Sequence, residues 1–237
     1  RVPQMALEFI PLSIWPLVMA GVSESYARDP AKLPGAIDLY YRLLFLLVLP
    51  IAAFGFAFSQ QLVPLLFGPA MERAARMTQL FFVVFSYSFI YTPISMALYV
   101  VEKSWVNMLV FALLAIINIG LDLALIPRFG LWGAFFPVAV VMAAAIAAFR
   151  IAAGKLGVGV RIPAAFICRC YVAVLPVACL SLSASRWSAP GALAAQIASG
   201  IVLLWAGIRV TGIVGAREKE LILHLPLPWK RAIVSLF

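Results

Sequence analysis

The stretch NIGLDLALIPRFGLWGAFFP, residues 118–137, holds two apolar runs separated by Pro-Arg-Phe-Gly at 127–130. Two polar residues, Asn118 and Asp122, lie four positions apart in the first run, a spacing that places them on one face of a helix. Proline and glycine together predict a break in the chain. The stretch therefore predicts a helical hairpin whose first helix carries a polar pair in apolar surroundings.

The composition of the whole chain identifies the solvent around this hairpin. Of 237 residues, 65% are hydrophobic and 11% are charged, and the mean hydropathy is +1.07, whereas soluble domains carry about 25% charged residues. Too few polar side chains remain to cover a surface in water, so the solvent is predicted to be a lipid bilayer. The apolar runs are long and continuous, which favours helices over alternating strands. The predicted fold class is an all-α polytopic membrane protein.

Seven apolar segments approach or exceed the length needed to cross the hydrocarbon core, which takes about 20 helical residues. The polar connection 23–39 predicts an interfacial loop, with room for a short amphipathic helix. Short connections at 102–103 and 127–130 predict tight hairpins, and the tail from residue 216 is predicted to lie along the membrane surface. The seven segments are 5–22, 40–63, 76–100, 104–126, 131–153, 164–184 and 190–214.

The basic residues predict the orientation of these segments. The net charge of +9 comes from lysines and arginines scattered near segment ends, which is typical of membrane proteins and does not indicate nucleic-acid binding. Alternating segments divide the loops between two sides, and thirteen of the 18 basic residues fall on the side that holds loop 154–163 and the tail. The positive-inside rule makes that side cytoplasmic, so the C-terminus is predicted to be cytoplasmic.

Polar residues inside the segments are candidates for a substrate cavity, because polar groups in a bilayer usually face the bundle or water. In the third segment four of them share one helix face, and in the fourth segment three do. Hydrogen bonding between helices is an equally good explanation for the serines, threonine and asparagines, and Asp122 is close enough to Pro127 to lie at headgroup depth. The candidates are Glu8, Arg42, Ser88, Tyr91, Thr92, Ser95, Asn107, Asn118 and Asp122. No catalytic residue, metal site or cofactor is predicted.

Three stretches resemble the multidrug/oligosaccharidyl-lipid/polysaccharide (MOP) superfamily, and within it most closely the Wzx-type polysaccharide and O-antigen flippases. The first is the NIGLDLALIPRFGLWGA hairpin. The second, LLFLLVLPIAAFGFAFSQQLVPLLFGPAMERAA at 43–75, is similar to a Pro-kinked helix followed by a Leu-Phe-Gly turn, and ALYVVEKSW at 97–105 resembles the link that follows. The resemblance is good over residues 5–160. Two departures are Asp122, where Asn is frequent, and the bulky stretch 135–137.

The resemblance implies the organisation of the chain. Such transporters have two six-helix lobes, commonly followed by two extra helices. Residues 1–153 would then be part of the C-terminal lobe with about five transmembrane helices. Residues 154–214 would be the two additional helices, and 215–237 a cytoplasmic tail. The first lobe would lie outside the 237 residues.

The resemblance also implies a function: flipping of undecaprenyl-diphosphate-linked oligosaccharide repeat units, for O-antigen or exopolysaccharide, across the bacterial inner membrane by alternating access. The partners implied are the lipid-linked oligosaccharide, the lipid bilayer and the polysaccharide polymerase machinery, with no nucleic acid. The diphosphate would require cationic or hydrogen-bonding groups, for which Arg42 is the best candidate in this chain. The chain is predicted not to be an enzyme.

Two alternatives remain open. A multidrug and toxic compound extrusion (MATE)-type cation-coupled antiporter of the same superfamily would use a carboxylate deep in a span, and Glu8 and Asp122 are the candidates. A membrane-embedded glycosyltransferase or ligase would need clustered carboxylates, a metal site or a catalytic histidine in a sizeable loop. The one histidine, His224, lies in the tail, so the enzyme hypothesis has little support.

Overall fold

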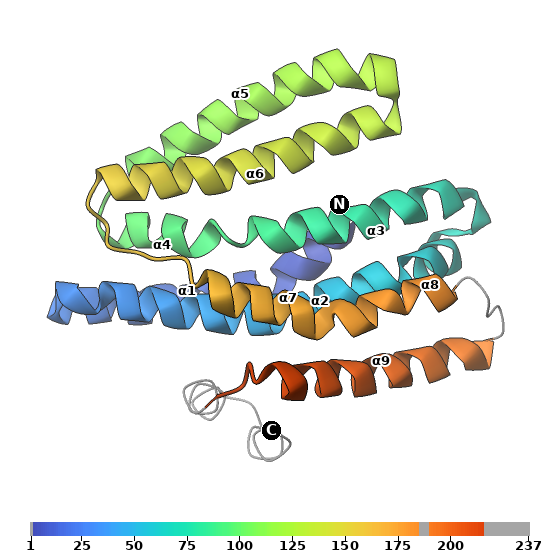
Figure 1. Cartoon of the computed structure of the whole chain (residues 1–237). Helices are drawn as coiled ribbons and strands as arrows, with labels where there is room; N and C mark the ends of the chain where they lie inside the picture. The colour runs from blue at the N-terminus through green and yellow to red at the C-terminus, as the bar shows by residue number, and fades with distance from the viewer. Residues whose placement is uncertain (1, 185–189, 216–237) are drawn as a thin grey trace. The chain divides into compact units, whose positions relative to one another are not determined.

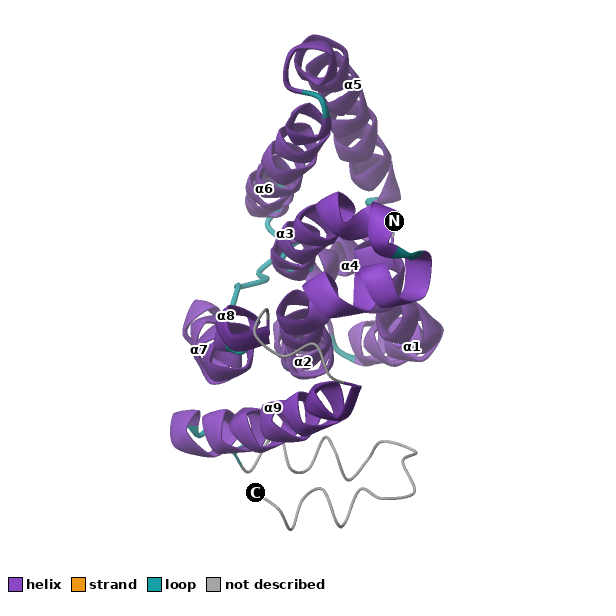
Figure 2. Cartoon of the chain, turned by 90° about the vertical axis from the view of Figure 1, so that its right-hand side faces the viewer, coloured by secondary structure: helices purple, strands orange, loops and turns teal. Residues whose placement is uncertain are grey.

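The computed structural model describes residues 2–184 and 190–215, and all regular secondary structure in these ranges is helical (Figure 1). Figure 2, coloured by secondary structure, shows only helices and loops there. The elements are α1 (Val2–Arg28), η1 (Pro30–Lys32), α2 (Leu33–Phe67), η2 (Pro69–Met71), α3 (Glu72–Ser88), α4 (Thr92–Val100), α5 (Ser104–Phe129), α6 (Leu131–Lys155), α7 (Ala164–Cys179), α8 (Ser181–Ala184) and α9 (Pro190–Thr211).

Six helical segments in the described part are long and apolar enough to cross a membrane, and α7 is a shorter apolar helix. The prediction of an all-α polytopic membrane protein is therefore confirmed. The predicted spans lie largely on helices, although several boundaries differ from the prediction and two spans are interrupted. The predicted surface tail, which begins at residue 216, lies outside the described residues.

The predicted loop at 23–39 is wrong. Helix α1 continues to Arg28, and the chain then needs only Asp29 and the single turn η1 before α2 begins at Leu33. The Asp29 carboxylate accepts a hydrogen bond from the backbone N–H of Ala31 over 3.0 Å, so it caps η1 in the way expected of Asp. The polar residues after Val22 belong to the last turns of α1. Their polarity therefore indicates a helix end close to the membrane surface and not a loop.

The hairpin of residues 118–137 is confirmed, but its turn is shorter than predicted. Helix α5 runs through Pro127 to Phe129, and Gly130 alone, with φ at 55°, links it to α6. The helices then leave the turn in close contact. A Cβ at Gly133 would overlap the backbone carbonyl of Leu125 and lie 2.7 Å from Cα of Ile126, so only glycine fits there.

Two predicted spans are interrupted. The third segment breaks at residues 89–91, between α3 and α4, and the sixth breaks at Leu180, between α7 and α8. The polar residues of the third segment therefore do not follow one continuous helix face. Pro93 lies at the start of α4, where its missing N–H and fixed φ suit a helix N-terminus. The tight connection at 102–103 is confirmed, with Glu102 at φ 60°.

The chain divides into two compact units, described separately. The first contains residues up to Tyr41 and residues Leu80–Ile162, and the second contains Arg42–Gln79 and the chain from Pro163 onwards. In the first unit α4 contacts α1, α5 and α6, and α5 packs along α6. The predicted division at residue 153 separates a transporter lobe from two additional helices, whereas these two units are defined by contacts within the chain. The predicted division therefore stays a prediction.

The second unit is held by close helix packing and by amide hydrogen bonds. Helix α7 packs along α9, where a Cβ at Gly207 would overlap the backbone carbonyl oxygen of Ala173. The Gln60 amide donates to Gln79 over 3.0 Å, and the Gln61 amide donates to Gln196 over 2.9 Å. Small residues and side-chain amides at helix contacts are typical of membrane bundles.

Candidate functional site

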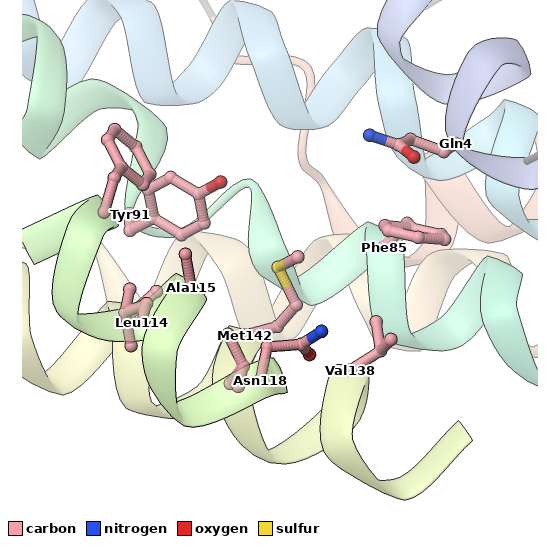
Figure 3. A pocket seen from close by; sticks show the side chains of 11 residues that line it. Gln4, Phe85, Tyr91, Leu114, Ala115, Asn118, Val138 and Met142 are labelled. Atoms are coloured by element: carbon pink, nitrogen blue, oxygen red, sulfur yellow. The ribbon is translucent and has the colours of Figure 1, made fainter. Parts of the chain in front are cut away.

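The first unit contains a cavity of about 340 Å³ whose lining comes from α1, α5, α6, the end of α3 and the turn before α4. Its walls are mostly apolar, with three polar side chains. Figure 3 shows these three, Gln4, Tyr91 and Asn118, entering from different segments of the chain. The complete lining is Gln4, Phe85, Tyr91, Phe111, Leu114, Ala115, Asn118, Val138, Val141, Met142 and Ala145.

The two side-chain amides in the lining are each hydrogen-bonded to a carboxylate one helical turn away. On α5, the Asn118 amide donates to Asp122 Oδ2 over 2.8 Å. On α1, the Gln4 amide donates to Glu8 Oε1 over 3.0 Å. Neither carboxylate is itself part of the lining. A carboxylate in a membrane helix is costly, and a hydrogen bond from an amide reduces that cost, so each carboxylate also fixes the orientation of an amide at the cavity.

The interruption between α3 and α4 places Tyr91 at the cavity. Residues 89–91 form a turn, and Tyr91 precedes the first residue of α4. The Tyr41 hydroxyl donates to the carbonyl oxygen of Ile90 over 2.7 Å, which satisfies a backbone acceptor in this turn. A broken helix is tolerated at membrane depth where side chains satisfy such groups.

Aromatic contacts fix the Tyr91 ring. It stacks on Phe149 of α6 with the ring centroids 5.3 Å apart and the planes inclined by 13°. Phe111 of α5 contacts both rings edge-on, at 6.0 Å from Tyr91 and 5.2 Å from Phe149. Two helices, α5 and α6, therefore hold the Tyr91 ring, so its place at the cavity is determined by packing.

Four other predicted site residues lie away from the cavity lining. The Ser88 hydroxyl donates to the carbonyl oxygen of Phe85 over 2.8 Å. The Asn107 amide donates to the backbone carbonyl oxygen of Ser95 over 3.0 Å, and Asn107 is fully buried. These bonds tie helices together or satisfy local backbone. Thr92, the first residue of α4, is half-buried and does not line the cavity.

Arg42 belongs to the second unit. Its guanidinium lies 4.8 Å from the centre of the Phe166 ring, a cation–π contact. The cavity of the first unit is therefore built without it, and a role for Arg42 towards a diphosphate stays a prediction.

Several lining residues were missed in the sequence. Gln4 carries a readable signal, since it is an amide four residues before Glu8 in an apolar segment. Phe85, Phe111 and Met142 carry none, because an apolar residue in a membrane helix looks the same whether it faces lipid, a neighbour or a cavity. In the part of the chain that the structure describes, no group of three or more His, Cys, Asp and Glu residues could hold a metal.

Thiol accessibility tests the cavity directly. With Cys168, Cys170 and Cys179 replaced by serine, Asn118→Cys in the full-length protein is expected to react with a small, membrane-impermeant thiol reagent, because the cavity admits water. Leu123→Cys lies on the same helix with the native Leu123 73% exposed on the apolar surface, and it is expected to stay unlabelled in the bilayer. Equal protection of both positions would contradict a water-filled cavity.

Comparisons with known proteins identify the family. No match was found among curated proteins, and none among solved structures. The family model described as "Lipid II flippase MurJ" matches residues 1–202. This result confirms a flippase of the MOP superfamily but does not support the Wzx type in particular. Because the match covers most of the 237 residues, the chain belongs to the lipid II flippase MurJ family, a group of multi-pass membrane proteins that flip lipid-linked precursors.

Proposed function

We propose that the chain is part of a two-lobe transporter that flips lipid II across the bacterial cytoplasmic membrane by alternating access. The observation that carries this proposal is the family match over residues 1–202. A flippase moves its substrate without making or breaking a covalent bond in it, which agrees with a site of amides, aromatic rings and a tyrosine hydroxyl. The family match supports neither a cation-coupled drug antiporter nor a glycosyltransferase.

The cavity of the first unit suits part of a sugar-containing headgroup. Its volume of about 340 Å³ lies at the low end of the range for small-molecule sites, about 300–1,000 Å³. Side-chain amides and the Tyr91 hydroxyl can both donate to and accept from the hydroxyl and amide groups of such a headgroup. No lysine or arginine lines it, so we place the diphosphate elsewhere, at Arg42 or at cations of the other lobe.

Complementation tests the proposal. Expressing the full-length transporter that contains this chain in cells depleted of their own lipid II flippase is expected to restore growth. The same transporter is expected to leave the O-antigen of cells lacking a Wzx-type flippase unrestored. Restored O-antigen without restored growth would overturn lipid II as the substrate and favour an oligosaccharide repeat unit instead.

The positive-inside rule, with the charge bias described above, predicts the orientation. Within the first unit, the turn at 29–32, the turn at 101–103 and the loop after α6 lie at one end, and the α5–α6 turn with Arg128 lies at the other (Figure 1). Alkaline phosphatase fused after Gly157 is expected to be inactive in the cytoplasm, whereas a fusion after Gly130 is expected to be active outside it. Equal activities from the two fusions would contradict this topology.

A further inference from the structure

A second cavity lies at the end of the first unit that is predicted to face the cytoplasm. Its volume is about 410 Å³. Helix α4, the last turns of α6 and the loop that follows α6 contribute its walls. Two arginines border it, Arg150 and Arg161, and the other lining residues are small or apolar: Ile94, Ala153, Gly154, Val158, Val160 and Ile162.

The loop that carries Arg161 is fixed to the end of α6. The backbone N–H of Val158 donates to the carbonyl of Ala153 over 3.0 Å, and the N–H of Gly157 donates to that of Gly154 over 3.2 Å. With Gly157 at φ 67°, these two bonds form a Schellman motif. A further bond joins the N–H of Val160 to the carbonyl of Val158 over 2.8 Å. The backbone that leads to Arg161 is therefore bonded in place, and the chain folds back over the helix end to close the cavity.

The two arginines have no acidic partner among the described residues. Neither makes a hydrogen bond or an ion pair with any residue in the described ranges, where the ion pairs are Arg28 with Glu24 and Lys32 with Asp29. Within the described ranges, two guanidinium groups thus border one partly apolar cavity without a compensating carboxylate. Guanidinium groups bind phosphate through paired N–H donors.

The position of the cavity along α6 indicates that the phosphate of a lipid headgroup can reach it. Helix α6 has 25 residues and is about 37 Å long at about 1.5 Å per residue, more than the hydrocarbon core of about 30 Å. Its last turn therefore extends past the hydrocarbon core, and Arg150 lies close to the boundary, from where an arginine side chain reaches the headgroups. Basic pockets between membrane helices at this depth bind the headgroups of anionic lipids.

We propose that the cavity between Arg150 and Arg161 binds a lipid-borne phosphate. The guanidinium groups contact the phosphate, and the apolar walls at Ile94, Val158 and Val160 contact the adjoining ester and the start of the chain. Two lipids present this chemistry: an anionic phospholipid and a polyprenyl diphosphate. This inference concerns a site separate from the substrate cavity and holds whichever precursor is flipped.

Lipid titration of the full-length protein in neutral detergent, read by native mass spectrometry, tests the proposal. The probes are phosphatidylglycerol, undecaprenyl diphosphate and, as a zwitterionic reference, phosphatidylcholine. Each arginine near an anionic lipid contributes about fivefold in affinity, so Arg150→Gln with Arg161→Gln is expected to weaken binding of the anionic lipid about 30-fold. Lys155→Gln removes one charge at the same helix end without touching the cavity lining, so it measures the loss that a single nearby surface charge causes, at most about fivefold.

The outcomes show whether the site exists and which of the two lipids supplies the phosphate. A selective loss for phosphatidylglycerol supports a phospholipid site, and a selective loss for undecaprenyl diphosphate supports a carrier-lipid site. The pair Arg150→Lys and Arg161→Lys keeps the charge and is expected to retain most of the binding, which controls for damage to the fold. Equal binding of both anionic lipids by the double glutamine variant and by Lys155→Gln would overturn the proposal. In that case the arginines only balance the negative end of the α6 dipole.

Discussion

Gly207→Ala is expected to lower the melting temperature of the full-length protein by about 3 °C or more. A new Cβ would overlap the carbonyl oxygen of Ala173 on α7 and lie 3.0 Å from its carbonyl carbon. Both atoms belong to backbone, so no rotamer change relieves the overlap and the two helices must separate. Alanine in a helix is better than glycine by about 1 kcal/mol, and this gain is smaller than the cost of moving a packed helix.

Gly120→Ala is the matched control. Gly120 lies within α5, and no described atom outside its own helix lies within 4 Å of the Cβ position. The helix propensity of alanine then acts alone, so this variant is expected to be as stable as the parent or slightly more stable. Thermal unfolding of both variants in detergent, followed by fluorescence-detected size exclusion, measures the difference. Equal melting temperatures for the two variants would show that α7 and α9 do not approach as closely as described.

Asn118→Leu is expected to reduce transport at least about tenfold. The change removes one of three polar groups from the cavity lining, and it removes the hydrogen-bond donor to Asp122. The Asp122 carboxylate is partly buried, and a fully buried acceptor left without a donor would cost about 1–3 kcal/mol, so part of that cost is expected here. The rate of lipid II flipping in vesicles that contain the full-length protein is the measurement, with Leu123→Ile on the lipid-facing side of α5 as the control.

A double variant distinguishes a role at the cavity from a role in stability. Replacing both partners of a hydrogen bond by apolar groups can be nearly neutral for stability, so Asn118→Leu with Asp122→Leu is expected to restore the melting temperature lost in Asn118→Leu. Transport is expected to stay low, because the cavity still lacks its amide. Recovery of transport together with stability would mean that the pair only supports the fold.

The hairpin illustrates how far the sequence predicts the structure. Composition predicted helices in lipid, and the four-residue spacing of Asn118 and Asp122 predicted a pair that the structure joins by a hydrogen bond. The turn was placed too early because proline was treated as a helix end. Pro127 lacks an N–H, but α5 ends only two residues later, so the missing bond falls in its last turn and the left-handed Gly130 ends the helix.

The interrupted third span shows why the sequence alone did not predict the helix break and the cavity beside it. Ser88, Thr92 and Ser95 have helical spacing and apolar neighbours, so their pattern is the same with or without a break at 89–91. What stabilises the break is remote in sequence: the Tyr41 hydroxyl bonded to Ile90, and Phe149 stacked on Tyr91. Contacts between distant helices determine both the break and the cavity beside it, and one sequence does not reveal them.

The length of α2 has a consequence for where the membrane surface meets the protein. Its 35 residues extend about 52 Å at about 1.5 Å per residue, more than the roughly 40–45 Å of a bilayer with its headgroups. A helix longer than the bilayer must tilt or protrude. The start of α2 carries the polar residues Asp38 and Arg42, so protrusion at this end exposes the least apolar surface to water. The 25 residues from Leu43 to Phe67 alone cover about 37 Å. Arg42 then marks the boundary between headgroups and hydrocarbon at this end of the helix.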